Sequence, residues 1–384
     1  MANSLNRRDW LRQSALAVAG LTSAPAWLVA APARQPLAYR EFGPDFDPRT
    51  APPTNIRARL SANENPWGPS DKTKQALIDS LGESNRYAFQ QIWSLRTGMA
   101  EKDGVKVSYI LPGAGSSELL AAGINAYAPK GKVLLADPCY ISDGMLGNFP
   151  MEKIPLTADY QYDLDAMAAK VDPAVHSLVY ICNPNNPTGA ILPADKLRKF
   201  IDDVSPKVPI LLDEAYIDYA TDPTTASMVD KVKEGKNVII LRTFSKLYAF
   251  AGLRVGYALA RPALLKVLEP FTQQGFGVSV PSAAAGLAAL KDTEFQQMTL
   301  RKTAESKQFL LDTLKGLDYK PLDSSANFVL FPIKMKGPQF QSQMMKEGIL
   351  VRHWYFDKQP WCRVSIGTMD EMKAFAEAFT KVVS

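Results

Sequence analysis

The chain has few of the residues that build metal and disulfide sites, with three cysteines and two histidines among 384 residues. Cys139, Cys182 and Cys362 form no Cys-x-x-Cys pair and have no histidine cluster beside them, so they indicate no metal site. Because their number is odd, at least one thiol is free, and we interpret all three as packing residues. His176 begins an apolar run, which favours a structural role, and His353 has no evident role.

Long apolar runs and a block of lysines and arginines are also missing. The net charge is +5 without such a block, which gives no case for a nucleic-acid partner. The one run near the N-terminus is too short and too rich in alanine for a stable membrane anchor, which needs roughly 20 strongly apolar residues. With 46% hydrophobic and 22% charged residues, the composition is that of a globular protein long enough for two domains.

The first 33 residues have the layout of an export signal. Arg7 and Arg8 precede Trp10 and a weakly apolar run that ends in small residues at Ala33. This is the three-part arrangement of a secretory signal. The arginine pair resembles a twin-arginine signal, although Trp10 departs from the commonest form, and a retained amphipathic helix is the alternative. We therefore expect export by the twin-arginine machinery, cleavage near Ala33, and a periplasmic or secreted protein.

From about Val107 the sequence alternates short apolar runs with helical patterns. Near-continuous apolar runs are expected of strands that are buried on both faces of a parallel sheet. Repeated alternation of strands and helices predicts a large α/β domain with a mainly parallel sheet. Strands are expected at 107–112, 132–138, 176–184, 208–216, 237–245 and 256–260, with helices at 116–128, 164–171 and 194–204 between them.

After about Phe295 the pattern changes to a long polar helix, three short apolar runs and a closing helix, which predicts a smaller α+β domain. Residues 34–60 are rich in proline, arginine and aspartate and are expected to form an extended arm. The predicted organisation is a signal at 1–33, an arm at 34–70 that joins the small domain, a large cofactor-binding domain at 71–294 and a small C-terminal domain at 295–384.

Unusual residue clusters fall where predicted strands end and helices begin, which is where open α/β sheets bind ligands. The stretch "LPGAGSSELL" places Gly113, Gly115 and Ser116 at such a turn. Glycines let backbone N–H groups approach an anion, and the N-terminus of a helix favours negative charge. The same pattern is equally typical of a turn that only caps a helix.

Three further motifs also stand at predicted strand ends. "NPNNPTG" at 183–189 combines a rigid backbone with amide side chains, although asparagine and proline also dominate ordinary turns. Asp213 ends an apolar strand, where a carboxylate is costly without a cationic partner, and a helix cap is its alternative role. Ser245 and Lys246 end the next strand, with Arg254 farther along. Each charge could also be a solvated surface group.

One cofactor would use all of these groups together. Pyridoxal 5′-phosphate needs a lysine amine for its aldehyde and a carboxylate near its ring nitrogen. It also needs donors for its phenolate oxygen, and hydroxyls, an arginine and helix-end amides for its phosphate. The sequence supplies one of each in separate strand-end loops. Their joint occurrence indicates a pyridoxal-phosphate site.

The order of the motifs resembles that of fold-type-I aminotransferases, closest to the histidinol-phosphate aminotransferase group. In chain order the motifs are "SANENPWGP", "NRY", "GAGSSELL", "DPCY", "NPNNPTG", "DEAY", "TFSKLYAFAGLRVGY" and "CRVSIGT". The resemblance covers about Ala58 to the C-terminus. It implies a mainly parallel seven-stranded sheet with helices on both faces, a smaller α+β domain, and a homodimer with shared active sites.

The resemblance also implies the roles of individual residues. Lys246 would bond to the cofactor's aldehyde and then move the proton between the substrate Cα and the cofactor, and Asp213 would pair with the ring nitrogen. The remaining contacts would be Tyr216 and Asn186 with the phenolate oxygen, Tyr140 with the ring face, Gly115, Ser116, Thr243, Ser245 and Arg254 with the phosphate, and Tyr87 with the phosphate in the partner subunit.

For the substrate, the resemblance implies that Arg363 takes the α-carboxylate as a bidentate pair. Asn65 and Arg352 are further candidate substrate residues, and Ala88 replaces the proline that usually follows the tyrosine of "NRY". Four aromatic residues near Arg363 suit an aromatic or large amphipathic substrate, although core packing would explain half of them equally well. They are Trp354, Tyr355, Phe356 and Trp361.

The predicted function is a pyridoxal-phosphate-dependent aminotransferase that moves an amino group from an amino acid or related amine, aromatic or large, to a 2-oxo acid. A decarboxylase or C–S lyase on the same fold is the alternative, because the bond that is cleaved depends on which Cα substituent stands perpendicular to the cofactor ring. Export argues against cytoplasmic histidine biosynthesis and favours modification of an exported metabolite or siderophore-type peptide. A degenerate binding protein would have lost Lys246, Asp213 or Arg254, and all three are present.

Replacing Arg7 and Arg8 together by lysine is expected to keep the protein in the cytoplasm, because the twin-arginine machinery reads that pair. Cell fractionation followed by immunoblotting measures the outcome. Arg12→Lys, which leaves the pair intact, is the matched control and should still be exported. Export of the double-lysine variant would contradict the twin-arginine assignment.

Overall fold

The protein is described here by a computed structural model that covers residues 54–142 and 148–384. The predicted signal at 1–33 and the first part of the predicted arm lie outside the described residues. Within those two described ranges, no helix is both long and apolar enough to cross a bilayer.

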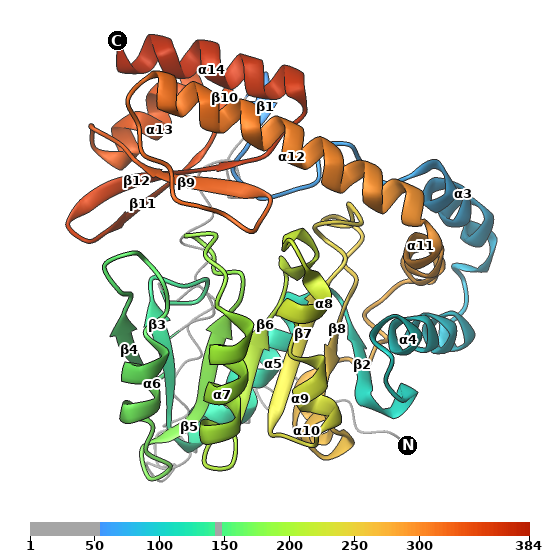
Figure 1. The fold of residues 1–384 in the computed structure, drawn as a ribbon. Helices are drawn as coiled ribbons and strands as arrows, with labels where there is room; N and C mark the ends of the chain where they lie inside the picture. The colour runs from blue at the N-terminus through green and yellow to red at the C-terminus, as the bar shows by residue number, and fades with distance from the viewer. Residues whose placement is uncertain (1–53, 143–147) are drawn as a thin grey trace, which may run out of the picture. The chain divides into compact units, whose positions relative to one another are not determined.

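A seven-stranded sheet forms the core of the larger domain (Figure 1). The strand order is β2-β8-β7-β6-β5-β3-β4, and β8 runs antiparallel to both of its neighbours while the other pairs are parallel. This confirms the predicted mainly parallel α/β sheet. The strands are β2 (Ile110–Gly113), β3 (Lys132–Asp137), β4 (Met151–Pro155), β5 (His176–Cys182), β6 (Ile210–Asp213), β7 (Val238–Thr243) and β8 (Gly256–Leu259).

Two strand assignments differ from the sequence-based expectation. No strand is expected at Met151–Pro155, yet β4 forms there at the edge of the sheet. Its residues are half-buried or exposed, so they do not form the apolar run that identifies a central strand. The strand expected from residue 107 begins three residues later, because Val107–Tyr109 forms a 3₁₀ turn.

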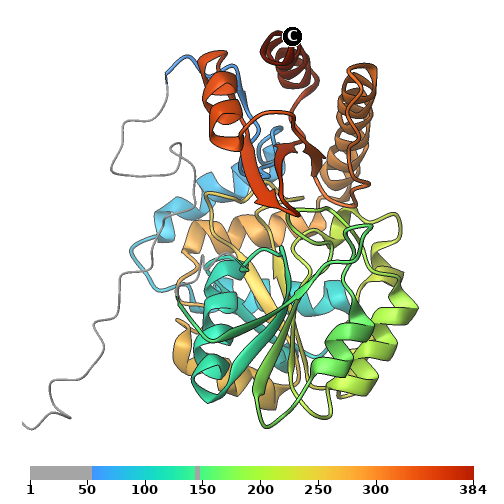
Figure 2. The ribbon, with the colours of Figure 1, turned by 90° about the vertical axis from the view of Figure 1, so that its left-hand side faces the viewer.

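Helices cover both faces of the sheet (Figure 2). On one face α5 (Ser116–Tyr127) packs with α10 (Pro262–Leu268), and on the other α6 (Leu164–Lys170) packs with α7 (Ala194–Val204). Each helix packs on the sheet through an apolar face. In α7 this face consists of the buried residues Leu197, Phe200, Ile201 and Val204, which lie at helical spacing. The other helices of this domain are α3 (Asp71–Ser80), α4 (Phe89–Asp103), α8 (Pro223–Ala226), α9 (Val229–Lys233) and α11 (Val280–Lys291).

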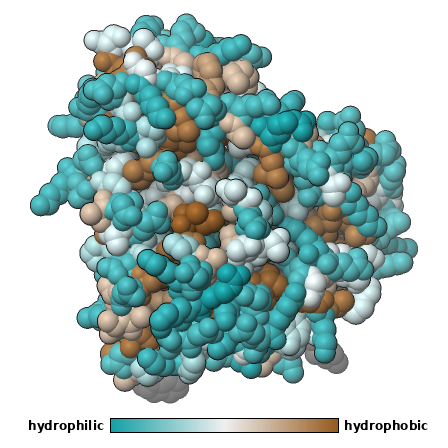
Figure 3. Space-filling view, in the orientation of Figure 1, coloured by the Kyte–Doolittle hydropathy of each residue, from teal (hydrophilic) through white to brown (hydrophobic). Residues whose placement is uncertain are grey.

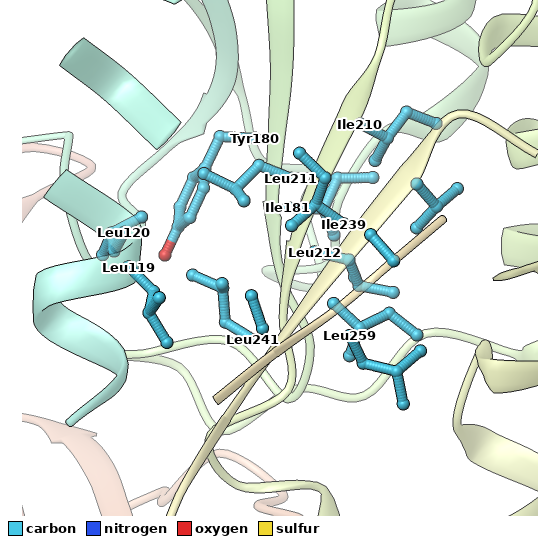
Figure 4. Close-up of a cluster of buried hydrophobic side chains, with 14 of the residues drawn as sticks. Leu119, Leu120, Tyr180, Ile181, Ile210, Leu211, Leu212, Ile239, Leu241 and Leu259 are labelled. Carbon is cyan, nitrogen blue, oxygen red and sulfur yellow. The ribbon is translucent and has the colours of Figure 1, made fainter. Parts of the chain in front are cut away.

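The centre of the sheet is aliphatic (Figure 4). Ile181, Leu211, Leu212, Ile239 and Leu241 from β5, β6 and β7 have no exposed surface. Burying a side chain of this size contributes about 1.5–3 kcal/mol, so these three strands are held firmly in register. The loops that leave their carboxyl ends are therefore anchored on a rigid base.

A second hydrophobic cluster contains Ala58, Leu60 and residues between Leu310 and Phe379. It surrounds an antiparallel sheet in the order β11-β12-β9, and β1 pairs in parallel with β10, so the segment before α3 joins the C-terminal part. The elements are β1 (Ala58–Arg59), α12 (Thr293–Gly316), β9 (Phe328–Pro332), α13 (Gly337–Lys346), β10 (Ile349–Leu350), β11 (Arg352–Phe356), β12 (Gln359–Ser365) and α14 (Met369–Val383).

The strand-end motifs leave the sheet at one edge. Strands β5, β6 and β7 are parallel, and β2 has the same direction because β8 is antiparallel to both β2 and β7. Their carboxyl ends face the C-terminal α+β part of the chain (Figure 1). On the face seen in Figure 3, hydrophilic residues cover most of the surface.

Candidate active site

A cavity of about 380 Å³ lies at the carboxyl edge of the sheet, between the strand-end loops and the C-terminal part. Most of the residues predicted from the sequence line it, although they come from seven separate segments of the chain. They are Ser116, Tyr140, Asn186, Asp213, Tyr216, Thr243, Ser245, Lys246, Arg254, Arg352 and Arg363.

Lys246 follows β7, and its Nζ donates hydrogen bonds to the backbone carbonyls of Asn63 (3.0 Å) and Ala62 (3.3 Å). Burial, together with the guanidinium groups of Arg363 and Arg254, lowers the pKa of Lys246 to about 8. At pH 7 about one amine in ten is then neutral, against about one in three thousand for an ordinary lysine. The neutral amine is the form that attacks a carbonyl carbon.

Asp213 ends β6 and is only 3% exposed. Its carboxylate accepts hydrogen bonds from the Ala215 N–H (3.1 Å) and the Tyr180 hydroxyl (3.3 Å). Burial raises the pKa of Asp213 to about 6. Within residues 54–142 and 148–384 no lysine or arginine forms an ion pair with it, so its ionised form would gain from a cationic group on a ligand.

A hydrogen-bonded network surrounds the hydroxyl of Tyr216. It accepts hydrogen bonds from the side-chain amides of Asn63 (3.0 Å) and Asn186 (3.3 Å). Ser365 fixes Asn63, accepting from its backbone N–H at 2.7 Å and donating to its Oδ1 at 2.9 Å. Burial raises the pKa of Tyr216, so its hydroxyl stays protonated and remains a donor.

Asn63 lines the cavity, although the sequence motif alone predicts a site role for Asn65 and not for Asn63. Asn65 does not line the cavity. Its Nδ2 donates to the Leu247 carbonyl (2.9 Å) and its Oδ1 accepts from the Trp67 N–H (3.1 Å), so this amide holds the turn together. The repeated asparagine of "SANENP" was the signal that could have pointed to Asn63.

The beginning of α5 and Arg254 form a cradle of donors. Gly115 caps the helix with a φ of 82°, and Arg254 lies 3.5 Å from the hydroxyls of both Ser245 and Ser117. Thr243 accepts the backbone N–H of Ser245 at 3.1 Å. An arginine, hydroxyl groups and a helix N-terminus are together the donor set that binds a phosphate.

Arg363 on β12 is buried and reaches across to the strand-end loops. Its Nη1 donates to Oδ1 of Asn186 and its Nη2 to the Ser61 carbonyl, both at 2.6 Å. Burial, followed by the charge of Arg352, lowers the pKa of Arg363 to about 10, so the group remains charged at neutral pH. Arg352 on β11 pairs with Arg363 on β12 and also lines the cavity. The cavity therefore contains two guanidinium groups.

Other predicted residues lie outside this cavity. Tyr87 is 81% exposed and contacts Phe89 edge-on, with ring centres 6.2 Å apart. Trp361 is buried and stacks on Phe356, so it packs the core instead of walling the cavity beside Arg363. His353 hydrogen-bonds Gln341 at 2.6 Å.

The family model for aminotransferase class I and II matches residues 56–379. The chain belongs to this family. A histidinol-phosphate aminotransferase from Moorella thermoacetica is 34% identical over 333 residues, which cover 85% of each chain. An aromatic amino acid aminotransferase from Rhodococcus opacus is 34% identical over 323 residues, 83% of this chain and 88% of that one.

Among solved structures, the histidinol-phosphate aminotransferase from Sinorhizobium meliloti in complex with pyridoxal-5′-phosphate matches with a TM-score of 0.77. It is 27% identical, and the match covers 85% of this chain and 91% of that one. The protein is thus a pyridoxal-phosphate-dependent aminotransferase. These relatives favour amino-group exchange over the decarboxylase or lyase alternative.

The cavity fits this cofactor in three respects. It offers a phosphate-type cradle at Arg254, a buried carboxyl at Asp213 that forms no direct ion pair among the described residues, and an amine with a lowered pKa at Lys246. A Cβ at Gly115 would lie 2.3 Å from Nη2 of Arg254, so only glycine lets the arginine reach the helix N-terminus.

Gly115→Ala is expected to weaken binding of pyridoxal phosphate at least about tenfold, because the new methyl group would displace Arg254 and cost a charge-assisted hydrogen bond. Gly252→Ala is the matched control, since Gly252 also lines the cavity and a Cβ there meets no atom within 4 Å. Titration of each apoprotein with pyridoxal phosphate, followed by visible absorbance, measures the affinities. Equal affinities for the two variants would contradict the cradle.

Proposed function

We propose that this aminotransferase holds pyridoxal phosphate through Lys246, Asp213 and the cradle at Arg254, and exchanges the amino group of a large or aromatic amino acid with a 2-oxo acid such as 2-oxoglutarate. The observation that carries the proposal is that these three groups line one cavity, although Asp213 ends β6 while Lys246 and Arg254 lie in the segment that joins β7 to β8. When bound, the cofactor supplies an electron sink for negative charge that develops at the substrate Cα.

The chain's own residues would position and deprotonate the substrate. Arg363 would bind the α-carboxylate as a bidentate pair through two of its three guanidinium nitrogens, which places the substrate Cα near Lys246. Nζ of Lys246, with its pKa near 8, would take the proton from Cα and later return one, because a base of this strength is matched to neutral pH. Asp213 would remain ionised beside a protonated ring nitrogen.

The identity of the amino donor is proposed from the two guanidinium groups in the cavity and from the names of the matched relatives. Arg363 accounts for one carboxylate, and Arg352 offers a second position for a polar or anionic group. The names of the matched relatives include aromatic amino acid and histidinol-phosphate aminotransferases. Histidinol phosphate, which carries a phosphate in place of a carboxylate, is therefore the second candidate donor, and the two guanidinium groups of the cavity favour it.

We also propose that the enzyme works outside the cytoplasm on an exported metabolite or siderophore-type peptide, with the pair at Arg7 and Arg8 as support. Twin-arginine export carries folded proteins, which would allow the cofactor to be loaded before export.

A homodimer with shared active sites is proposed from an exposed aromatic patch made of Tyr87, Phe89 and Phe276. Their exposed fractions are 81%, 66% and 50%, and the ring centres of Phe89 and Phe276 lie 5.2 Å apart. Clustered exposed rings mark surfaces that are covered by a partner. In such a dimer Tyr87 would reach the phosphate held by the partner subunit.

Lys246→Ala is expected to lower amino-group exchange by about a thousandfold, because it removes the covalent link and the base. The assay supplies L-phenylalanine, histidinol phosphate or L-alanine with 2-oxoglutarate and measures glutamate. Lys307→Ala is the control, since Lys307 also has its pKa lowered to about 8 by burial but does not line the cavity. Carbon dioxide, pyruvate or ammonia formed without an acceptor would instead indicate the decarboxylase or lyase.

Mixing subunits tests the shared site. Tyr87→Ala and Lys246→Ala are expected to be impaired alone, and a mixed dimer should regain activity because one of its two sites has both residues. Lys246→Ala mixed with Asp213→Ala is the control and should regain none, since both residues serve the same subunit's site. A monomer in sedimentation, or no recovery in the first mixture, would refute the proposal.

A further inference from the structure

A second cavity of about 540 Å³ lies beside the first, below the hairpin of β11 and β12. One wall comes from the end of β3 and the residues after it, and another from β4 and the loop that follows. The third wall is β11 and its turn, from Trp354 to Asp357. The mechanism proposed above makes no use of this cavity.

Two segments of the chain, β11 and the residues after β3, contribute to the walls of both cavities. On β11, Arg352 lines the first cavity and Trp354 the second, and alternate residues of a strand lie on the same face. The guanidinium carbon of Arg352 lies 5.7 Å from the centre of the Trp354 ring. After β3, Tyr140 lines the first cavity while Pro138 and Ser142 line the second. The second cavity therefore begins where the first ends.

The wall of the second cavity is aromatic and ordered. Tyr160 meets Phe356 edge-on with ring centres 5.9 Å apart, and its hydroxyl donates to Asp357 at 2.9 Å. Phe356 in turn stacks on the buried Trp361 at 4.8 Å. Of the four aromatic residues expected near Arg363, Trp361 is buried behind the wall. The other three, Trp354, Tyr355 and Phe356, line the second cavity.

Two features of this wall suit a bound ligand. Tyr355 lines the second cavity and is 72% exposed, so its ring is available for contact. Nε1 of Trp354 is a buried donor that finds no acceptor among the described residues. An unsatisfied buried donor is rare in proteins, and an acceptor on a ligand would satisfy it.

We propose that the second cavity binds the far end of the substrate's side chain, and that this end is an aromatic ring carrying a hydrogen-bond acceptor such as an ether or carbonyl oxygen. This inference rests on the proposed function, in which Arg363 holds the α-carboxylate. The second cavity opens beside Trp354, whose ring centre lies 5.7 Å from the guanidinium carbon of Arg352, so a side chain that fills it extends past Arg352. The substrate class is therefore an amino acid longer than phenylalanine or tyrosine.

O-benzyl-L-tyrosine is a suitable probe, since it ends in a ring and carries an ether oxygen. The wild-type holoenzyme should use it with a kcat/KM at least about tenfold above that of L-alanine, because it buries a whole ring. Trp354→Ala should lower kcat/KM for O-benzyl-L-tyrosine by about tenfold or more and change that for L-alanine by less than about twofold.

A second variant fills the cavity from the opposite wall. Ala158 is exposed and lines the second cavity, so Ala158→Trp should fold and exclude the long side chain while leaving exchange with L-alanine intact. Ala174→Trp is the matched control, because Ala174 is also exposed but lines neither cavity. It should leave both donors unaffected.

Binding without turnover separates this inference from the proposed function. The carboxylate 3-(4-benzyloxyphenyl)propanoate keeps the side chain of the probe and lacks the amine, so it cannot exchange. Calorimetry on the holoenzyme should show it binding at least about tenfold more tightly than propanoate, and Trp354→Ala should remove that difference. Failure of every amino donor would refute the proposed function alone, whereas equal affinity of the two carboxylates would overturn the second cavity as a substrate site.

Discussion

The site depends on one constraint, the parallel hydrogen-bonded register of β5, β6 and β7. In that register Cys182 pairs with Asp213 and Asp213 with Leu241, so neighbouring strands end at the same edge. The aliphatic core between the helices fixes the three strands, and each following loop begins from a set position (Figure 4). Groups that are far apart in the sequence converge because the strands that carry them end together.

Burial shifts the pKa values of two ionisable groups in the cavity in opposite directions. Burial raises the pKa of Asp213 and lowers that of Lys246, so each group is brought toward its neutral form in the ligand-free site. A ligand with a cationic ring nitrogen and an anionic phosphate would compensate the charges of both Asp213 and Arg254. The charges of the cavity are thus complementary to those of pyridoxal phosphate.

The two ends of the described chain complete the site. The segment from Ser61 to Asn63 and the strand β12 meet through Ser365 and Arg363, which bond to Asn63 and Ser61. Arg363 then reaches Asn186 in the large domain. The residues proposed to bind the substrate and the cofactor therefore belong to one hydrogen-bonded network.

The sequence by itself determined the parallel sheet, the cofactor and most of the residues that line the cavity, because apolar runs and strand-end motifs are local patterns. Only the tertiary structure placed Asn63 in the cavity wall, revealed β4 at the sheet edge, and separated Trp361 in the core from Trp354 beside a cavity. Those outcomes depend on which side chains meet across elements, such as Asn63 with Tyr216 and Ser365. No spacing within one segment encodes such contacts.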